Sequence, residues 1–177
     1  METKITRERL ITFLLETPMF MKLTPMELAE IIHIVKVEKY KAGDLVFEEG
    51  DAGDAWYVLY RGAVEVLKND EAGGKKINEL SPRACFGEIS ILDGLPRSAS
   101  IRATEDSEVI CIPRKGFAEL LDDNHLVAYK LLHEMAILLA ERQRTATLKL
   151  SELLLANGIN EIHEEIKRII GESSTRE

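Results

Sequence analysis

Cysteine is scarce in this chain, and so are aromatic residues and long apolar runs. Only Cys85 and Cys111 occur among 177 residues, and their spacing does not match a metal-ligand motif. Two free thiols fit a reducing, cytoplasmic compartment. Apolar runs such as residues 136–140 are far too short to cross a bilayer. We therefore expect a cytoplasmic chain with no metal centre and no membrane-spanning segment.

Positive charge is also in short supply. The chain has 23 Lys and Arg residues against 31 Asp and Glu residues, which gives a net charge of -8. A DNA-binding surface must neutralise phosphates with Lys and Arg. The small basic groups Lys75 with Lys76 and Arg142 with Arg144 are typical of solvated surface pairs. We expect no nucleic-acid partner. The charged residues 1–4 do not resemble a signal sequence either.

The first part of the chain has helical signals. Apolar residues recur at helical spacing after Thr6, and Pro18 predicts the end of that helix. In the sequence Thr24-Pro25-Met26-Glu27, a threonine N-cap precedes proline at the first helical position and a glutamate that can complete a capping box. These residues predict a second helix that ends near His33.

The pattern changes from residue 35 to residue 112, where short apolar segments alternate with turn residues rich in glycine and aspartate. The turn signals recur roughly every 8 to 12 residues, which is typical of a small sandwich or barrel. Residues 56–60 and 63–67 flank Arg61-Gly62, and this spacing predicts a tight hairpin.

The chain returns to helical patterning after Pro113. Residues 114–121 predict a short helix, and Asp122, Asp123 or Asn124 can cap a long helix from about residue 125 to residue 155. Asn157-Gly158 predicts its end. An amphipathic helix over residues 158–171 is expected next, with a polar tail after it. Whether this last helix docks a partner or folds back on the barrel stays open.

The long helix carries an apolar heptad pattern over about four repeats. We expect this seam to form a homodimer through residues 129–153, and the alternative is that it packs on its own barrel. The seam residues are Tyr129, Leu132, Ala136, Leu139, Gln143, Ala146, Leu150 and Leu153.

Residues 86–100 carry the strongest chemical signal. Gly87-Glu88 can open a short helix, whose exposed N–H groups favour an anion. Arg97 offers a planar fork that binds phosphate bidentately. Ser98 adds a hydroxyl donor, and Ala99 lets its backbone N–H approach a ligand closely. Because Glu88 is an acceptor, it suits a sugar hydroxyl. The segment therefore predicts a site for a phosphorylated sugar.

This segment resembles the phosphate-binding cassette of the cyclic-nucleotide-binding domain family, the type found in the catabolite activator protein and the protein kinase A regulatory subunit. The resemblance covers roughly residues 18–155. It includes residues 43–47, Gly50-Asp51, residues 57–59 and Gly62. It implies a mainly β fold with flanking helices, in which an eight-stranded jelly-roll β-barrel follows N-terminal helices and precedes a long C-terminal helix.

On this basis we divide the chain into four parts. Residues 1–33 form an N-terminal helical segment and residues 34–123 the barrel. Residues 124–155 form the long lid or dimer helix, and residues 156–177 a short terminal helix and tail.

The resemblance also implies roles for individual residues. Glu88 would accept a hydrogen bond from the ribose 2′-OH, and Arg97 would pair with the cyclic phosphate. Arg142 and Gln143 would cover the purine, although Arg142 can equally be a solvated arginine. The residues expected to add backbone, hydroxyl or packing contacts are Phe86, Gly87, Ile89, Ser90, Ser98 and Ala99. The expected ligand is cyclic AMP, with cyclic GMP as the alternative.

The chain departs from the family pattern at the purine, where the long helix of the activators offers hydroxyls and this chain has Arg142 and Gln143, and in two further respects. Arg83 stands three residues before Phe86, where family members often have glycine, which carries a cost if the turn needs a positive φ. Only about twenty residues follow the long helix, too few for the DNA-binding domain of the family's activators.

We therefore expect a regulatory switch that acts through its C-terminal helix on an unknown downstream protein. No second acid and no metal cluster is placed to hydrolyse the ligand, so an enzyme is not expected. The alternatives are a protein of this fold that binds no nucleotide, and a transcription factor.

Overall fold

The computed structural model describes residues 5–69 and 74–156. The chain divides into two compact units, residues 1–135 and residues 136–177. The first unit contains all the strands described below, and the second contains most of the long helix.

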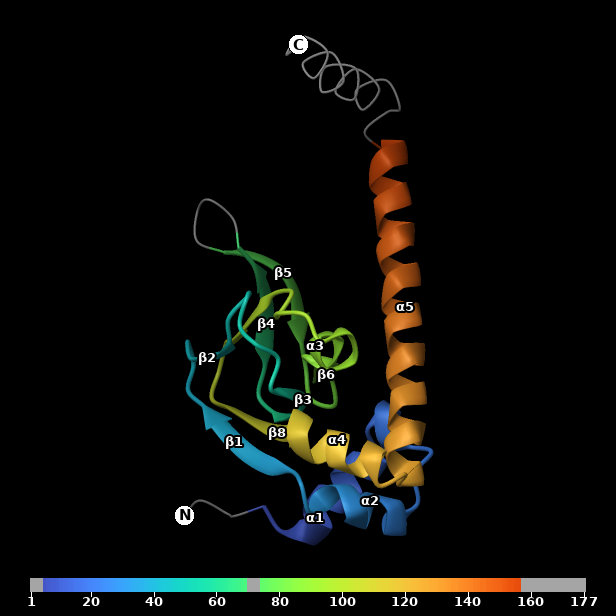
Figure 1. Ribbon diagram of the computed structural model, residues 1–177. Coiled ribbons are helices and arrows are strands. Elements are labelled where there is room, and N and C mark those ends of the chain that lie inside the picture. Colours follow the sequence, from blue (N-terminus) through green and yellow to red (C-terminus); the bar gives the residue numbers. More distant parts are fainter. Residues whose placement is uncertain (1–4, 70–73, 157–177) are drawn as a thin grey trace. The chain divides into compact units, whose positions relative to one another are not determined.

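The described residues form two antiparallel four-stranded sheets, with strand orders β1-β8-β3-β6 and β2-β7-β4-β5 (Figure 1). This arrangement confirms the predicted eight-stranded jelly roll. The strands are β1 (Lys36–Tyr40), β2 (Leu45–Phe47), β3 (Ala55–Arg61), β4 (Val64–Lys68), β5 (Lys75–Leu80), β6 (Cys85–Phe86), β7 (Ser100–Ala103) and β8 (Ser107–Pro113).

The predicted hairpin between β3 and β4 is wrong. β3 pairs with β6 and β8, whereas β4 pairs with β5 and β7 in the other sheet. Gly62, with φ +94°, lies at the crossing, and a Cβ there would be 2.2 Å from Oγ of Ser107. The short link Gly62-Ala63 therefore carries the chain from one sheet to the other instead of turning it back to pair with β3.

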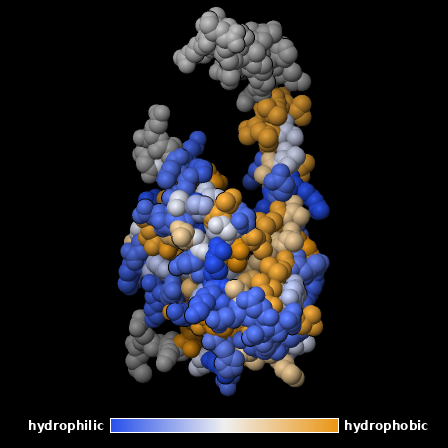
Figure 2. All heavy atoms as spheres, in the orientation of Figure 1, coloured by the Kyte–Doolittle hydropathy of each residue, from blue (hydrophilic) through white to orange (hydrophobic). Residues whose placement is uncertain are grey.

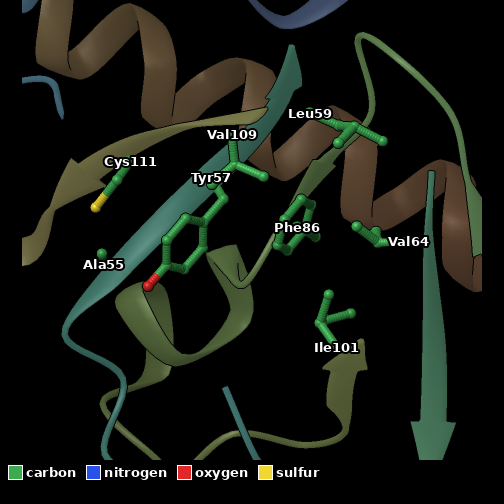
Figure 3. Close-up of a cluster of buried hydrophobic side chains, with 8 residues drawn as sticks. All are labelled: Ala55, Tyr57, Leu59, Val64, Phe86, Ile101, Val109 and Cys111. Atoms are coloured by element: carbon green, nitrogen blue, oxygen red, sulfur yellow. The ribbon is translucent and has the colours of Figure 1, made fainter. Parts of the chain in front are cut away.

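The core between the sheets is built from alternate residues of the strands. Tyr57 of β3 and Phe86 of β6 stack with their ring centroids 5.3 Å apart. Full burial of an apolar side chain contributes about 1.5–3 kcal/mol, so this cluster is a main source of stability. Figure 3 shows its eight buried members: Ala55, Tyr57, Leu59, Val64, Phe86, Ile101, Val109 and Cys111.

β3 is buried on both faces, because its other residues face the helices. Trp56 is fully buried, and its ring stacks on Phe20 at 5.8 Å and meets the edge of Phe117 at 6.1 Å. The helices that cover this side are α1 (Arg7–Leu15), the 3-10 turn η1 (Pro18–Phe20), α2 (Pro25–Ile32), α4 (Arg114–Asp122) and the first residues of α5 (Leu126–Ala156).

The predicted end of the first helix before Pro18 and the predicted capping box of the second helix are confirmed. The side chain of Thr6 caps α1, which ends at Leu15, and η1 begins at Pro18. At α2, Thr24 accepts from the backbone N–H of Glu27, and the Glu27 side chain accepts from the Thr24 N–H at 2.8 Å. The same Glu27 pairs with Lys130 of α5 at 2.5 Å, so one carboxylate both caps α2 and ties it to α5.

The long helix α5 has different surroundings along its length. In the first unit its buried residues are Val127, Ala128, Leu131 and Met135, while Tyr129 is 46% exposed. In the second unit Leu150 and Leu153 are exposed, and Figure 2 shows hydrophobic atoms gathered at this end of α5. The predicted helix end at Asn157-Gly158, the last helix and the polar tail lie outside the described residues.

β5 forms one edge of the second sheet. Its residues are exposed to solvent except Leu80, which is half-buried. Lys76 and Glu79 form an ion pair at 2.5 Å along this strand. Across residues 5–69 and 74–156, no helix has both the length and the apolar character needed to cross a membrane.

Candidate functional site

The site is organised around a helix of six residues, α3 (Glu88–Asp93), which is separated from β6 by Gly87 alone. Gly87 and Gly94 flank it with φ of 78° and 74°, both in the left-handed region that glycine adopts without strain. The N–H of Gly94 donates to the carbonyl of Ser90 at 3.0 Å and closes the helix. Glycine at both ends therefore allows the chain to enter and leave so short a helix.

The backbone of Arg97 is fixed against the loop that follows β2. Its N–H donates to the carbonyl of Asp51 at 2.8 Å, and its carbonyl accepts from the N–H of Gly50 at 2.9 Å. This pair of hydrogen bonds directs the arginine side chain into the barrel, where only 3% of the residue is exposed.

The Arg97 guanidinium is bonded to groups from two segments. Nη1 donates to the carbonyl of Gly87 at 2.8 Å. Nη2 donates to the carbonyl of Ala55 at 2.7 Å and to Oδ1 of Asp54 at 3.2 Å. A Cβ at position 87 would lie 2.8 Å from Nη1, so Gly87 is required for this approach as well as for its φ.

Arg97 forms an ion pair with Asp54 at 3.2 Å, and the Asp54 side chain is 82% exposed, so water screens this pair. Aromatic faces lie beside it, with Cζ 4.1 Å from the ring centre of Phe47 and 5.7 Å from that of Tyr57. The buried Nε has no hydrogen-bond partner in the described part of the chain. A buried guanidinium with a spare donor suits a small anion.

Glu88 directly follows Gly87, whose carbonyl accepts a hydrogen bond from the Arg97 guanidinium. Glu88 itself is 1% exposed. The structure therefore brings the predicted carboxylate and the predicted guanidinium to the same turn. One group can accept from a hydroxyl and the other can bind an anion.

The other predicted residues have varied positions. The side chain of Phe86 belongs to the barrel core, and Ser90 is buried. Ile89 and Ser98 are exposed, and the carbonyl of Ser98 accepts from Nζ of Lys68 at 2.9 Å. Ala99 is half-buried.

The two residues predicted to cover a purine, Arg142 and Gln143, lie on α5 in the second unit. Their contact with a ligand stays a prediction.

Sequence reasoning missed three residues that surround Arg97, namely Phe47, Asp54 and Tyr57. Gly53-Asp54 was interpreted only as a turn. A carboxylate directly before a buried strand is a signal that could have indicated a partner for the arginine. The two rings are on the consecutive strands β2 and β3, which belong to different sheets, so their convergence depends on the sheet topology.

The departure at Arg83 has a clear structural counterpart. Its φ is 75°, the left-handed conformation that glycine would favour. Its N–H donates to the carbonyl of Leu59 at 2.8 Å, its side chain pairs with Glu16, and its Cζ lies 5.5 Å from the ring centre of Phe13. Contacts to α1 thus compensate for strain just before the site.

No cluster of three or more His, Cys, Asp or Glu side chains suited to a metal ion occurs within residues 5–69 and 74–156.

Comparison with known proteins agrees with this geometry. Residues 37–124 match the model of the cyclic nucleotide-binding domain. The cyclic AMP receptor protein of Thermus thermophilus is 32% identical over 155 residues, which cover 87% of this chain and 70% of that protein. The chain belongs to the cyclic nucleotide-binding domain family. The cAMP-dependent protein kinase regulatory subunit of Aspergillus niger is 38% identical over 122 residues, 68% of this chain.

Solved structures of this family have the same fold. The Thermus thermophilus catabolite activator protein matches with a TM-score of 0.67 at 33% identity, over 77% of this chain and 62% of that one. A cyclic nucleotide-binding domain from Methylobacillus flagellatus matches with a TM-score of 0.73 at 24% identity, over 80% of this chain and 83% of that one. The chain spans only 29% of the length of the Aspergillus niger subunit.

Proposed function

We propose that this protein is a cyclic-nucleotide receptor that binds its ligand at Arg97 and Glu88 and acts as a regulatory module. The observation that carries the proposal is the buried Arg97 guanidinium, whose Nε has no partner among the described residues. Its three hydrogen bonds use three of the five N–H groups that a guanidinium offers. N–H donors of Arg97 therefore remain for a phosphate, whose negative charge would balance the positive charge of the guanidinium.

In this proposal Glu88 accepts a hydrogen bond from the ribose 2′-OH. Ser98 and Ala99, directly after Arg97, add a hydroxyl and a backbone N–H, and Ile89 and Ser90 line the site from α3. The proposed ligand is cyclic AMP, because the relatives at 38% and 32% identity are named as cyclic-AMP proteins. Competition calorimetry with cyclic GMP checks this choice, and tighter binding of cyclic GMP would reverse it.

Thermal melting with and without cyclic AMP tests the site. At a hundredfold excess over its dissociation constant, a ligand stabilises the folded state by about 2.7 kcal/mol. For a chain of this size, that corresponds to a rise in Tm of about 5 to 10 °C. A protein of this fold that binds no nucleotide would show no rise.

The variant that tests the role of Arg97 in binding is Arg97→Lys. Truncation to alanine would leave the carbonyls of Gly87 and Ala55 without their buried donor and so damage the fold. Lysine keeps the charge but loses the fork, so we expect the ligand-induced rise in Tm to disappear while the chain stays folded. Arg102→Lys is the control, because Arg102 is part-exposed and pairs with Glu65. An unchanged rise in Arg97→Lys would refute the assignment.

We further propose that α5 transmits the signal and forms a homodimer through its heptad seam, residues 129–153, with Arg142 and Gln143 covering the purine. Tyr129, Leu150 and Leu153 of the seam are exposed, which supports an unpartnered apolar face. Sedimentation of Leu150→Asp should give a monomer. Leu148→Asp is the control, since Leu148 is 66% exposed but lies outside the seam. A monomeric wild-type chain at high concentration would reject the dimer.

The proposed partner of the module is a downstream protein in the cytoplasm, without direct contact to nucleic acid or membrane. The proposal includes no turnover of the ligand, in keeping with relatives named as receptor or regulatory subunit. Chromatography of cyclic AMP after long incubation with the protein should recover it unchanged, and formation of AMP would indicate an enzyme.

A further inference from the structure

Arg114, the first residue of α4, binds three backbone carbonyls at once. Its N–H donates to the carbonyl of Asp54 at 2.7 Å, and its Nε donates to that of Gly53 at 2.6 Å. Its Nη2 donates to the carbonyl of Ser90 in α3. We call these three hydrogen bonds the Arg114 clamp. The clamp joins the end of β8 to the segment before β3 and to the short helix of the site.

The clamp acts on the two segments that also fix the guanidinium of Arg97. Asp54 and the next residue, Ala55, accept from Nη2 of Arg97, and Gly87 at the start of α3 accepts from Nη1. Arg114 binds the first segment at Gly53 and Asp54, and it binds α3 at Ser90, three residues after Gly87. The two arginines therefore hold the same pair of segments together, from different sides.

These two segments are in tight contact where the clamp binds them. A Cβ at Gly53 would lie 2.2 Å from Cβ of Ser90 and 3.4 Å from Nη2 of Arg114. Glycine at position 53 thus allows the loop to touch α3 directly. Because there is no spare volume, a small displacement of α3 would move the carbonyl acceptors of Arg97 relative to one another.

We propose that Arg114 is a positioning residue for the cyclic-nucleotide site, which holds α3 and the residue 53–55 segment in the arrangement that binds ligand. The inference rests on the proposed function. Arg114 is not itself placed against the ligand. Because Arg114 already holds the two segments in place, less conformational entropy is lost when ligand binds. Loss of this pre-organisation weakens affinity. Removing it should raise the dissociation constant even where the protein remains fully folded.

Isothermal calorimetry with cyclic AMP on the full chain, well below the Tm, measures this effect. We expect Arg114→Met to raise Kd about tenfold, which corresponds to about 1.4 kcal/mol. Arg114→Lys can still donate to one of the carbonyls, so its Kd should rise only about threefold, since a single charged hydrogen bond recovers part of the loss. A Kd for Arg114→Met within twofold of wild type would overturn the proposal.

Two controls separate positioning from general stability. Phe117→Leu changes a buried residue of the same helix, and it should lower the Tm while leaving Kd within about twofold, because it shares no hydrogen bond with the site. Lys115→Met changes an exposed neighbour and should alter neither. If Phe117→Leu raises Kd as much as Arg114→Met, the effect is one of stability and the proposal fails.

Hydrogen exchange on the ligand-free protein tests the clamp apart from ligand binding. Arg114→Met should accelerate exchange at the amides of α3 and residues 53–55 by at least about tenfold, and Lys115→Met should not. If wild type binds neither cyclic AMP nor cyclic GMP, the proposed function fails by itself, and this measurement still decides whether Arg114 orders the two segments. Unchanged exchange in Arg114→Met would refute the clamp.

Discussion

Replacing Arg83 should separate backbone strain from side-chain contact at the turn before the site. Arg83 has a φ of 75°, and its side chain pairs with Glu16 and lies over the ring of Phe13. Both Arg83→Gly and Arg83→Ala remove the side-chain contacts, but only glycine relieves the left-handed strain. The difference in stability between the two variants therefore reports the strain, less the greater unfolded-state entropy of glycine.

The magnitudes follow from the geometry. The left-handed conformation costs a residue with a Cβ about 1–2 kcal/mol. Glycine gives back about 0.4–1 kcal/mol of this through its greater entropy in the unfolded chain. We therefore expect Arg83→Gly to be about 1 kcal/mol more stable than Arg83→Ala. The lost ion pair is about half exposed on both sides, at 45% and 57%, so its contribution is small.

Urea unfolding followed by fluorescence of Trp56 measures this difference, which should also appear as about 2–4 °C in Tm. Arg61 provides the control pair, because it is an exposed strand residue without a positive φ. There alanine should be more stable than glycine, so the order of the two variants reverses. If alanine equals or exceeds glycine at position 83, the strain argument is wrong.

Three further predictions concern other residues. Gly87→Ala should abolish the ligand-induced rise in Tm, because its Cβ would lie 2.8 Å from Nη1 of Arg97; an intact rise in a melting assay would contradict this. The hydrogen bond from Lys130 holds the pKa of Glu27 below its ordinary value of 4.5. The carboxylate thus contributes stability above that pH, and the advantage of wild type over Glu27→Gln should shrink as pH falls below about 4.5; a constant difference in urea midpoints would refute it. Burial raises the pKa of Cys111 to about 12, so this thiol should resist alkylation at pH 8 in folded protein and react after denaturation, as mass spectrometry can show.

Local signals in the sequence predicted much of the structure. The capping box at Thr24 and Glu27 depends only on neighbouring residues, and the structure has it as predicted. The glycines that flank α3 and the arginine that follows it are also close in sequence, so the segment could be recognised before its geometry was known. A positive φ at Arg83 was considered from the sequence for the same reason.

Features that depend on sheet topology could not be predicted in this way. The link at Gly62 has the length of a hairpin turn, yet it joins strands of different sheets. Asp54 and Phe47 contact Arg97 only because the loops of the two sheets meet at α3. The ring of Phe86 belongs to the core between the sheets, and its expected contact with the ligand stays a prediction.

The open edge formed by β5 has a consequence for self-association. An unpaired strand edge can recruit the same strand of another molecule and seed fibres. Here the edge carries Lys75, Lys76 and Glu79, so two copies paired in parallel and in register, as in a fibre, would place like charges opposite one another. This charge pattern disfavours growth of the barrel into an extended intermolecular sheet, and Ile77, 59% exposed, is the strand's only large aliphatic side chain besides Leu80.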